Sequence, residues 1–173
     1  MSERANWVVR LLGPRRSSPA VPAPDAVLAE LGLSPREVVV PPAAVHVPVV
    51  RAGAFVFTSG QLPIRAGELI ATGRLGETLG VADGQACAQW CVLNALSAIR
   101  SEIGDLGQVK RVVKVVVYVA SGALFTDQAL VADGASELLG RAFGSAGRHA
   151  RSTVGVSALP LDAPVEVDLV VEI

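Results

Sequence analysis

Charge, aromatic residues and cysteine are all scarce in this chain. Aromatic side chains make up 4% of its 173 residues and charged ones 18%, below the roughly one quarter charged that is typical of soluble domains. The 15 basic and 16 acidic residues leave a formal net charge of -1. The molecule as a whole therefore does not attract a polyanion, and nucleic acid is not an expected partner. The low charge fraction predicts that another protein chain covers part of the surface.

The two cysteines, Cys87 and Cys91, are too few for a disulfide framework. Their spacing of four within a helix-like stretch favours two small buried residues over metal or redox use. No apolar run approaches the roughly 18 to 20 residues that span a bilayer. The most apolar N-terminal segment, residues 7–12, is short and is interrupted by Arg10, so no signal peptide is expected. We expect a soluble, cytoplasmic protein with no membrane partner.

What the chain does contain is apolar and rich in β-branched residues. Hydrophobic residues make up 51% of the sequence, and the share of valine favours a well-populated sheet. The length corresponds to one domain with one core. Residues 1–24 combine arginines with a Ser-Ser-Pro segment and further prolines, which predicts a flexible N-terminal arm. Residues 25–173 are then expected to form a single domain.

Apolar periodicity and the positions of glycine and proline predict the order of the elements. The expected helices cover residues 25–33, 82–103 and about 125–143, and the expected strands cover residues 45–50, 54–58, 109–119, 151–158 and 165–173. Residues 67–73 form a third strand or an extended loop. This order predicts an α+β domain in which two helices cover one face of a mixed sheet. The other sheet face must then be buried in another way.

The last two strands suggest a site. If they pair as a hairpin with both apolar sets on one side, Ser157 lies opposite Glu166. Arg151 and Glu166 then share a sheet face but lie about six residues apart along the ladder, roughly 20 Å at ~3.4 Å per residue. If both serve one site, that site lies between subunits. The alternative is that Arg151 is a surface charge at a strand end.

Three segments carry a family resemblance. They are residues 58–63 (TSGQLP), the valine-rich residues 112–119, and residues 149–156 (HARSTVGV), the last followed by Leu159-Pro160 and Val165-Glu166-Val167. Together they resemble the YjgF/RidA family, and in particular a branch with a longer N-terminus and a Gly-x-His-Ala-Arg-Ser-x-Val-Gly-Val motif. The resemblance covers about residues 45–173.

The resemblance implies a chorismate-mutase-like α+β fold with a mixed six-stranded sheet, assembled as a homotrimer with clefts between subunits. It also implies cofactor-free and metal-free hydrolysis of reactive enamines and imines, such as 2-aminoacrylate, to 2-keto acids and ammonia. Arg151 falls on the family arginine that binds the substrate carboxylate, and Glu166 on the carboxylate that helps to place the attacking water. Ser59 and Gly60 match cleft-lining residues of the neighbouring subunit, and Thr153 is expected to contribute to substrate binding.

Two positions depart from the family pattern. His46 stands where many family deaminases have a tyrosine, and Ala129, next to Gln128, stands where they have an asparagine. His46 either replaces the phenol as a hydrogen-bonding or titrating group or is structural. His149 is expected to be structural and to orient the glycine-flanked turn before Arg151.

The departures leave a second function open, a trimer that binds small carboxylates without turnover. Ribonuclease activity, often attached to the family, is less favoured because the net charge is -1 and no His/Lys/Asp constellation is evident.

Overall fold

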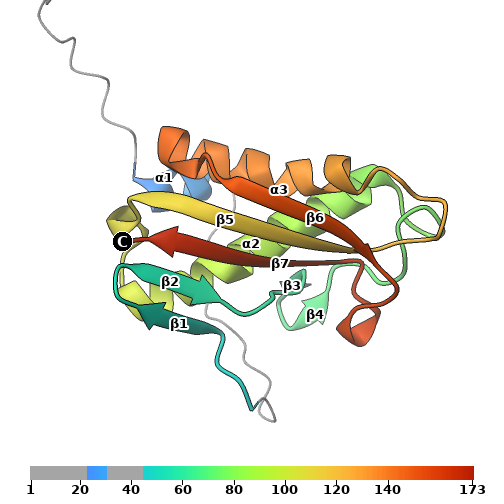
Figure 1. Cartoon of the computed structure of the whole chain (residues 1–173), viewed down its shortest axis with the longest axis horizontal. Helices are drawn as coiled ribbons and strands as arrows, with labels where there is room; N and C mark the ends of the chain where they lie inside the picture. The colour runs from blue at the N-terminus through green and yellow to red at the C-terminus, as the bar shows by residue number, and fades with distance from the viewer. Residues whose placement is uncertain (1–22, 31–44) are drawn as a thin grey trace, which may run out of the picture.

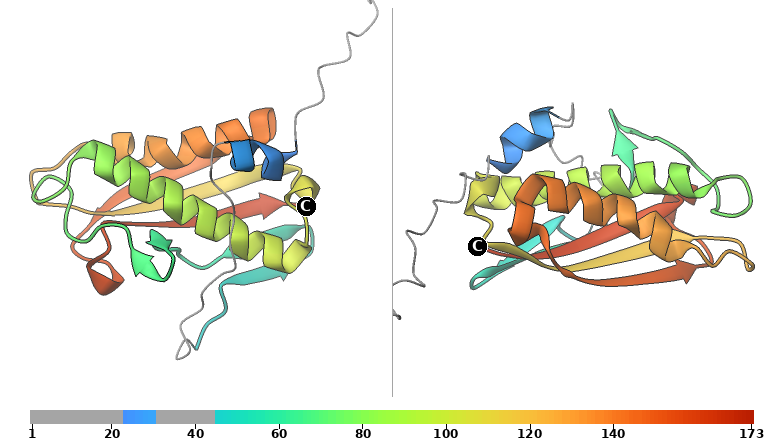
Figure 2. Two further views of the ribbon diagram at one scale, coloured as in Figure 1. Left: turned by 180° about the vertical axis from the view of Figure 1, so that it is seen from behind. Right: turned by 90° about the horizontal axis from the view of Figure 1, so that it is seen from above.

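A five-stranded mixed sheet carries two long helices on one face (Figures 1 and 2). The computed structural model describes residues 23–30 and 45–173. The strands are β1 (Val49–Ala52), β2 (Phe55–Thr58), β5 (Arg111–Ala120), β6 (Ala150–Val156) and β7 (Val165–Glu172), in the spatial order β1-β2-β7-β5-β6. β5 and β6 are parallel and the other neighbours are antiparallel. The predicted α+β class with helices on one face of a mixed sheet is confirmed.

The six-stranded sheet that the resemblance implied is wrong by one strand, because the main sheet has five. The segment near residues 67–73 does not join the main sheet, because β3 (Ile64–Arg65) and β4 (Glu68–Leu69) pair only with each other. Their hairpin lies by α2, where the Asn94 amide donates hydrogen bonds to the carbonyl oxygens of Leu62 at 2.8 Å and Ile64 at 3.0 Å. These side-chain bonds satisfy backbone groups that a sheet ladder would otherwise have taken.

The two long helices begin and end close to the predicted residues. α2 covers Val81–Ile103, and its first turn is capped by Asp83, which accepts a hydrogen bond from the Gly80 amide at 2.9 Å. It ends at Gly104, whose φ of 86° suits glycine. α3 covers Gln128–Phe143. The shorter helical segments are α1 (Pro24–Glu30), η1 (Leu106–Gln108), η2 (Gly144–Gly147) and η3 (Pro160–Asp162).

Predictions for the N-terminal part are tested only in places. α1 confirms a short helix near residue 25, and the end predicted for it at residue 33 lies outside the described residues. The same holds for residues 1–22 of the predicted arm, so the arm and the boundary at residue 25 stay predictions. In the described part of the chain no helix is both long and apolar enough to cross a membrane.

The core lies between the sheet and the helices. Alternate residues of β5 and β7, Val115, Val117 and Val119 in one and the odd-numbered residues of 165–171 in the other, are completely buried. Cys87 and Cys91 of α2 are free and buried in this layer, as predicted. Burial, followed by the Asp83 charge, raises the pKa of the Cys87 thiol to about 11, so it is a poor nucleophile near neutral pH.

The predicted hairpin of the last two strands is wrong. β6 and β7 are not neighbours, because β5 lies between them and pairs with both. The connection from β6 to β7 passes through η3, where Leu161 has a φ of 59° and Asp162 a φ of 61°, and so crosses β5 instead of turning tightly. Ser157 therefore does not lie opposite Glu166, whose ladder partner is Tyr118.

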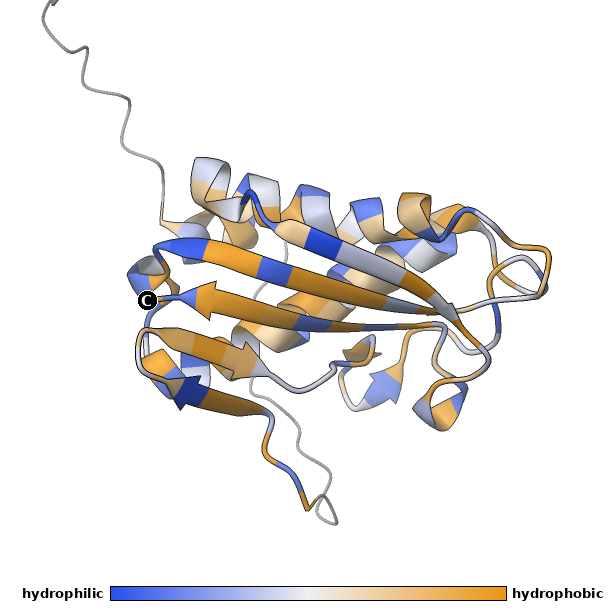
Figure 3. Cartoon of the chain, viewed as in Figure 1, coloured by the Kyte–Doolittle hydropathy of each residue, from blue (hydrophilic) through white to orange (hydrophobic). Residues whose placement is uncertain are grey.

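No element among residues 23–30 and 45–173 covers the sheet face away from the helices. It carries exposed apolar side chains, among them Val50 (51% exposed), Phe57 (43%) and Val154 (44%). β1 and β2 are mostly apolar in the view onto this face (Figure 3). A polar row crosses it, in which Lys114 donates to Ser152 Oγ at 2.6 Å and Tyr118 to Asp168 Oδ2 at 3.2 Å. We call this surface the open sheet face.

Candidate functional site

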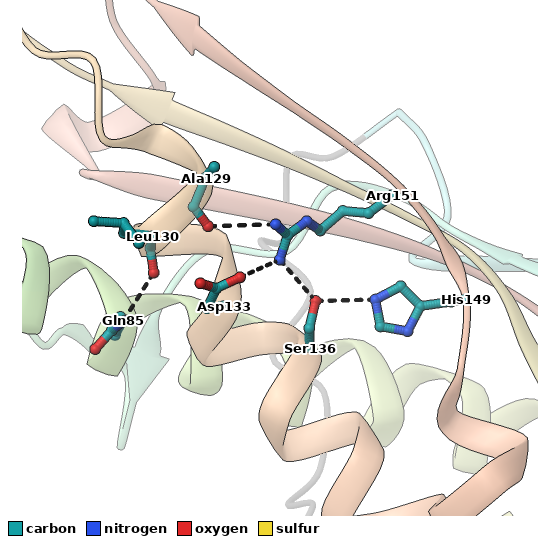
Figure 4. Close-up of polar contacts among 7 residues, drawn as sticks. All are labelled: Gln85, Ala129, Leu130, Asp133, Ser136, His149 and Arg151. Atoms are coloured by element: carbon teal, nitrogen blue, oxygen red, sulfur yellow. Dashed lines mark hydrogen bonds and ion pairs between the residues drawn. The ribbon is translucent and has the colours of Figure 1, made fainter.

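Arg151 lies on the outermost strand, β6, and points toward α3 (Figure 4). Its ladder partner is Val115, a buried residue on the helix side of the sheet. The Nη1 nitrogen donates to Asp133 Oδ1 at 2.8 Å and to Ser136 Oγ at 3.0 Å. The Nη2 nitrogen donates to the Ala129 carbonyl at 3.4 Å. These contacts hold the guanidinium with its side chain 25% exposed, so Arg151 is not a free surface charge.

The three α3 residues meet Arg151 because of helical spacing. Ala129, Asp133 and Ser136 are separated by four and three residues, so they lie on one side of the helix. The apolar side of α3, which includes Val131, Ala135 and Leu138 and packs into the core, is buried. The sequence analysis did not single out Asp133 or Ser136, although their spacing from Ala129 was a usable signal.

His149 fixes the other side of Ser136. Its Nδ1 lies 2.6 Å from the Gly147 carbonyl, which only accepts, so this nitrogen carries a hydrogen. In the neutral ring the Nε2 atom is then an acceptor for the Ser136 hydroxyl, 3.0 Å away. The hydroxyl oxygen in turn accepts from Arg151. A single chain of hydrogen bonds thus runs from the turn to the guanidinium. This contact agrees with the structural role expected for His149, which stays a prediction.

The Arg151 cluster, which comprises Arg151, Asp133, Ser136 and His149, keeps unused groups. Among the described residues, Nε of Arg151 and one of the two Nη2 hydrogens have no partner. The same is true of Oδ2 of Asp133, a side chain that is 41% exposed. The arginine and the aspartate neutralise each other, so with a neutral histidine the cluster has no net charge.

Thr153 and Gln128 continue the same side of β6 beyond Arg151. Thr153 pairs with Val117 and Gly155 with Val119, both on the helix side. A Cβ at Gly155 would lie 3.0 Å from Gln128 Nε2, so glycine leaves room for that amide. Gln128 donates to the Phe125 carbonyl at 2.7 Å and to Ser121 Oγ at 3.3 Å. Ala129, at the family asparagine position, reaches Arg151 with its backbone carbonyl.

Glu166 belongs to a second cluster, together with Gly60 and Ser59. A Cβ at Gly60 would lie 1.7 Å from Glu166 Oε1, so these two predicted site residues touch and a side chain at Gly60 would displace the Glu166 carboxylate. Ser59 Oγ donates to the Val47 carbonyl at 2.6 Å and its amide to the Pro48 carbonyl at 2.8 Å. This ties the end of β2 to the segment that contains the exposed His46.

The carboxylates of Glu166 and of the nearby Asp168 are partly shielded from water. Burial first, and then the charge of Asp168, raises the pKa of Glu166. Burial also raises the pKa of Asp168, while the Tyr118 hydroxyl and the Lys114 charge act in the opposite direction. A carboxylate in such surroundings is a better proton acceptor than one in bulk water.

One chain does not bring the two clusters together. Glu166 pairs with Tyr118 on the open sheet face, whereas Arg151 pairs with Val115 on the helix side. The prediction that Arg151 and Glu166 share a sheet face is therefore wrong. The prediction that they do not meet within one chain is consistent with this arrangement, because two strand spacings and a sheet thickness separate them.

A groove of about 540 Å³ lies elsewhere, where β5 and β6 begin. Its lining includes Phe55, Arg111, Arg148 and Glu172, and it approaches the Arg151 cluster only through His149. Within residues 23–30 and 45–173, no group of three or more His, Cys, Asp or Glu side chains is placed to hold a metal ion.

The fold, together with the Arg151-Ser152 pair on β6, points to one class of protein. Residues 26–173 match the sequence profile of the family described as "YjgF/chorismate mutase-like, putative endoribonuclease". The chain belongs to this YjgF/RidA family, so the family assignment is confirmed, while the branch stays a prediction.

Relatives and solved structures agree with this assignment. Protein TCP17 of Trypanosoma cruzi is 47% identical over 133 residues, which are 76% of this chain and 83% of that protein. The crystal structure of Atu1372 from Agrobacterium tumefaciens, of unknown function, has 39% identity and a TM-score of 0.80 over 87% of this chain and 93% of its own. The crystal structure of a putative endoribonuclease from Shewanella oneidensis has 30% identity and a TM-score of 0.84, and the match covers 87% of this chain and 99% of that protein.

Proposed function

We propose that this protein hydrolyses small carboxylate-bearing imines and enamines of the 2-aminoacrylate type to 2-keto acids and ammonia, without a cofactor. The single observation that carries the proposal is the Arg151 guanidinium, held by Asp133, Ser136 and the Ala129 carbonyl, with Nε and one Nη2 hydrogen left without a partner among the described residues. A fixed guanidinium edge binds a carboxylate with two parallel hydrogen bonds, which orients the rest of the molecule. Arg151 also stands at the position where the family resemblance expects the carboxylate-binding arginine.

The chemistry asks for orientation and one water molecule. An enamine first takes up a proton at carbon and becomes an iminium ion, the protonated form of the imine. Water then adds to the imine carbon, the carbon–nitrogen bond breaks, and the nitrogen leaves as ammonia while the carbon becomes a ketone. No electrons are gained or lost. Arg151 holds the carboxylate, Glu166 accepts a proton from the water, and Ser59, Gly60, Thr153 and His46 line the site.

The site is proposed to lie between subunits of a homotrimer. Arg151 and Glu166 lie on opposite faces of one sheet, so a complete site takes Arg151 from one protomer and Glu166 from the next. The exposed apolar side chains of the open sheet face, such as Phe57 at 43%, supply a surface for this contact. The small-carboxylate ligand has a parallel in the fold: E. coli TdcF, with 23% identity and a TM-score of 0.58, was solved with bound serine.

The test measures 2-keto acid release when amino-acid-derived imines are generated in the presence of the purified protein. Wild-type protein is expected to accelerate release, and Arg151→Gln to remove most of the acceleration. Arg141→Gln, which removes an exposed guanidinium from the last turn of α3, is the matched control and is expected to behave as wild type. An Arg151→Gln variant as fast as the parent would reject the proposal.

A second candidate is a trimer that binds small carboxylates without turnover. The observation in its favour is that Ala129 offers only a backbone carbonyl where many family deaminases have asparagine. Binding of 2-keto acids in a calorimeter, with no acceleration of imine hydrolysis, would favour this function. Ribonuclease activity is the third and least favoured reading, and RNA cleavage that persists through purification and is lost in a cleft variant would revive it.

A further inference from the structure

Glu166 lies on the open sheet face beside a second carboxylate, Asp168. The two residues are two positions apart on β7, so their side chains leave the same side of the strand, with Cα atoms roughly 7 Å apart at ~3.4 Å per residue. Both side chains are half-buried. Two acidic groups this close on a partly buried surface do not ionise independently, because the first negative charge opposes the second.

Tyr118 distinguishes the two carboxylates. It is the ladder partner of Glu166 on β5, yet its hydroxyl reaches diagonally and donates to Asp168 Oδ2 at 3.2 Å. Lys114, on the same face of β5, adds a positive charge that acts on Asp168. Among the described residues no donor binds the Glu166 side chain, which lies against the backbone of Gly60. Asp168 thus has a hydrogen bond and a nearby cation, and Glu166 has neither.

We propose that Asp168 is a positioning residue, which Tyr118 holds in its charged form and which makes Glu166 the proton acceptor of the proposed site. This inference rests on the proposed function and adds the residue that prepares its base. A general base works best when it holds a proton more strongly than a free carboxylate does and is still ionised at neutral pH. A fixed negative charge beside Glu166 has this effect.

The pKa shifts agree with this division of roles. Burial raises the pKa of Asp168, but the Tyr118 hydrogen bond and the Lys114 charge act to lower it. For Glu166, burial and then the Asp168 charge both raise the pKa. Asp168 therefore loses its proton first, and Glu166 titrates beside a charge that is already present. Environments that separate the titrations of two neighbouring carboxyl groups also separate their roles in proton transfer.

The other groups around Glu166 do not supply this charge. Cys91 of α2 packs against β7, and burial raises the pKa of its thiol well above the usual range, so it is neutral. The end of β2 brings no ionisable side chain to the carboxylate. In the proposed trimer Arg151 comes from the adjacent protomer, and Asp133 balances its charge. Within the described part of the chain, Asp168 is therefore the charge that acts on Glu166.

The first test needs no turnover. Side-chain carboxyl groups of the full-length protein are titrated by carbon NMR, and the Glu166 signal is identified by its loss in Glu166→Gln. We expect Asp168→Asn, which keeps an acceptor for Tyr118 but removes the charge, to lower the pKa of Glu166. Tyr118→Phe is expected to bring the titrations of the two carboxyl groups closer together. Glu172→Gln removes a charge from the same face of β7, and as the matched control it should leave the Glu166 titration unchanged.

The second test is the pH dependence of kcat/KM for imine hydrolysis. Asp168→Asn is expected to move the acid limb to lower pH and to lower the plateau about threefold, because a weaker base accepts a proton less readily. KM is expected to stay unchanged. Glu166→Gln is expected to lower the plateau about a hundredfold, the lower end of what a positioned general base contributes. A purely structural Asp168 would affect stability but would leave the acid limb where it is.

The outcomes separate this inference from the proposed function. An unchanged Glu166 titration in folded Asp168→Asn overturns the role of Asp168, as does a Glu166→Gln variant as active as the parent, while the carboxylate site at Arg151 stands. If wild-type protein does not hydrolyse imines but Asp168→Asn lowers the pKa of Glu166, the proposed function fails and the coupling of the two carboxylates is kept. Should Asp168→Asn fail to fold, Asp168→Ser takes its place in both measurements, with the same expected results.

Discussion

A methyl group added at Gly134 tests how closely α3 packs against α2. Gly134 faces α2, and a Cβ there would lie 2.5 Å from the Gln85 carbonyl oxygen and 2.8 Å from the Gln85 Cα. These are backbone atoms of a helix, so they cannot rotate away as a side chain could, and α3 must move off α2. Overpacking of this kind costs about 1–3 kcal/mol, and the better helix propensity of alanine returns about 1 kcal/mol at most. Because the obstacle is backbone, we expect Gly134→Ala to lower the free energy of unfolding by about 2 kcal/mol.

Gly140 supplies the control within the same helix. A Cβ at Gly140 has nothing within 4 Å, so Gly140→Ala is expected to raise the free energy of unfolding by up to about 1 kcal/mol through helix propensity alone. The assay is urea unfolding followed by circular dichroism at a fixed protein concentration, because any oligomer makes stability depend on concentration. If both variants shift stability in the same direction, the close approach of α2 and α3 is refuted.

Three further predictions address the site and the open sheet face. Ser136→Ala removes one acceptor of Arg151 and one donor to His149. Calorimetry should show about fivefold weaker binding of 2-oxobutyrate, equal to one net hydrogen bond. Unchanged affinity would contradict the view that Ser136 helps to hold the Arg151 guanidinium in place. Because burial raises the pKa of Glu166, its contribution to stability is full at pH below its unfolded pKa and is lost as pH rises through its folded one. Glu166→Gln should therefore flatten the fall in stability that begins above about pH 4, the ordinary range of a glutamate, measured by urea unfolding. An unchanged pH profile would count against it. Phe57→Asp places a charge on the open sheet face, and sedimentation should show trimers dissociating to protomers, whereas a persistent trimer would mean that another surface assembles it.

Much of the fold followed from periodicity. The run of valines at 112–119 predicted a strand, and β5 covers these residues. The alternation in 165–173 identified which side of β7 is buried. Such patterns define the faces of one strand, but not which strand lies beside it. That choice depends on the connection through η3, whose left-handed residues Leu161 and Asp162 carry no recognisable signal.

The orientation of Arg151 shows the same limit. A strand that alternates polar and apolar residues is expected to bury its apolar side. In β6, however, Val154 is 44% exposed on the open sheet face and Arg151 turns toward α3. β6 is an outermost strand, so its apolar side need not face the core of its own chain. On an edge strand, alternation therefore does not decide which side is buried in the protomer.

Two residues of α3 illustrate what propensity misses. Glycine has a low helix propensity, but at Gly134 the backbone of α2 leaves no room for a Cβ. The sequence analysis did not single out Asp133, because its contact with Arg151 depends on β6 lying beside α3. Both depend on how two distant segments pack, and helical periodicity alone does not contain that information.

The most direct test of the site is a crystal structure of the protein soaked with 2-oxobutyrate. We expect the ligand carboxylate to lie about 3 Å from Nε and Nη2 of Arg151, with Glu166 of an adjacent protomer facing the keto carbon. A carboxylate bound elsewhere, or an Arg151 that faces solvent with no protomer beside it, would contradict the account.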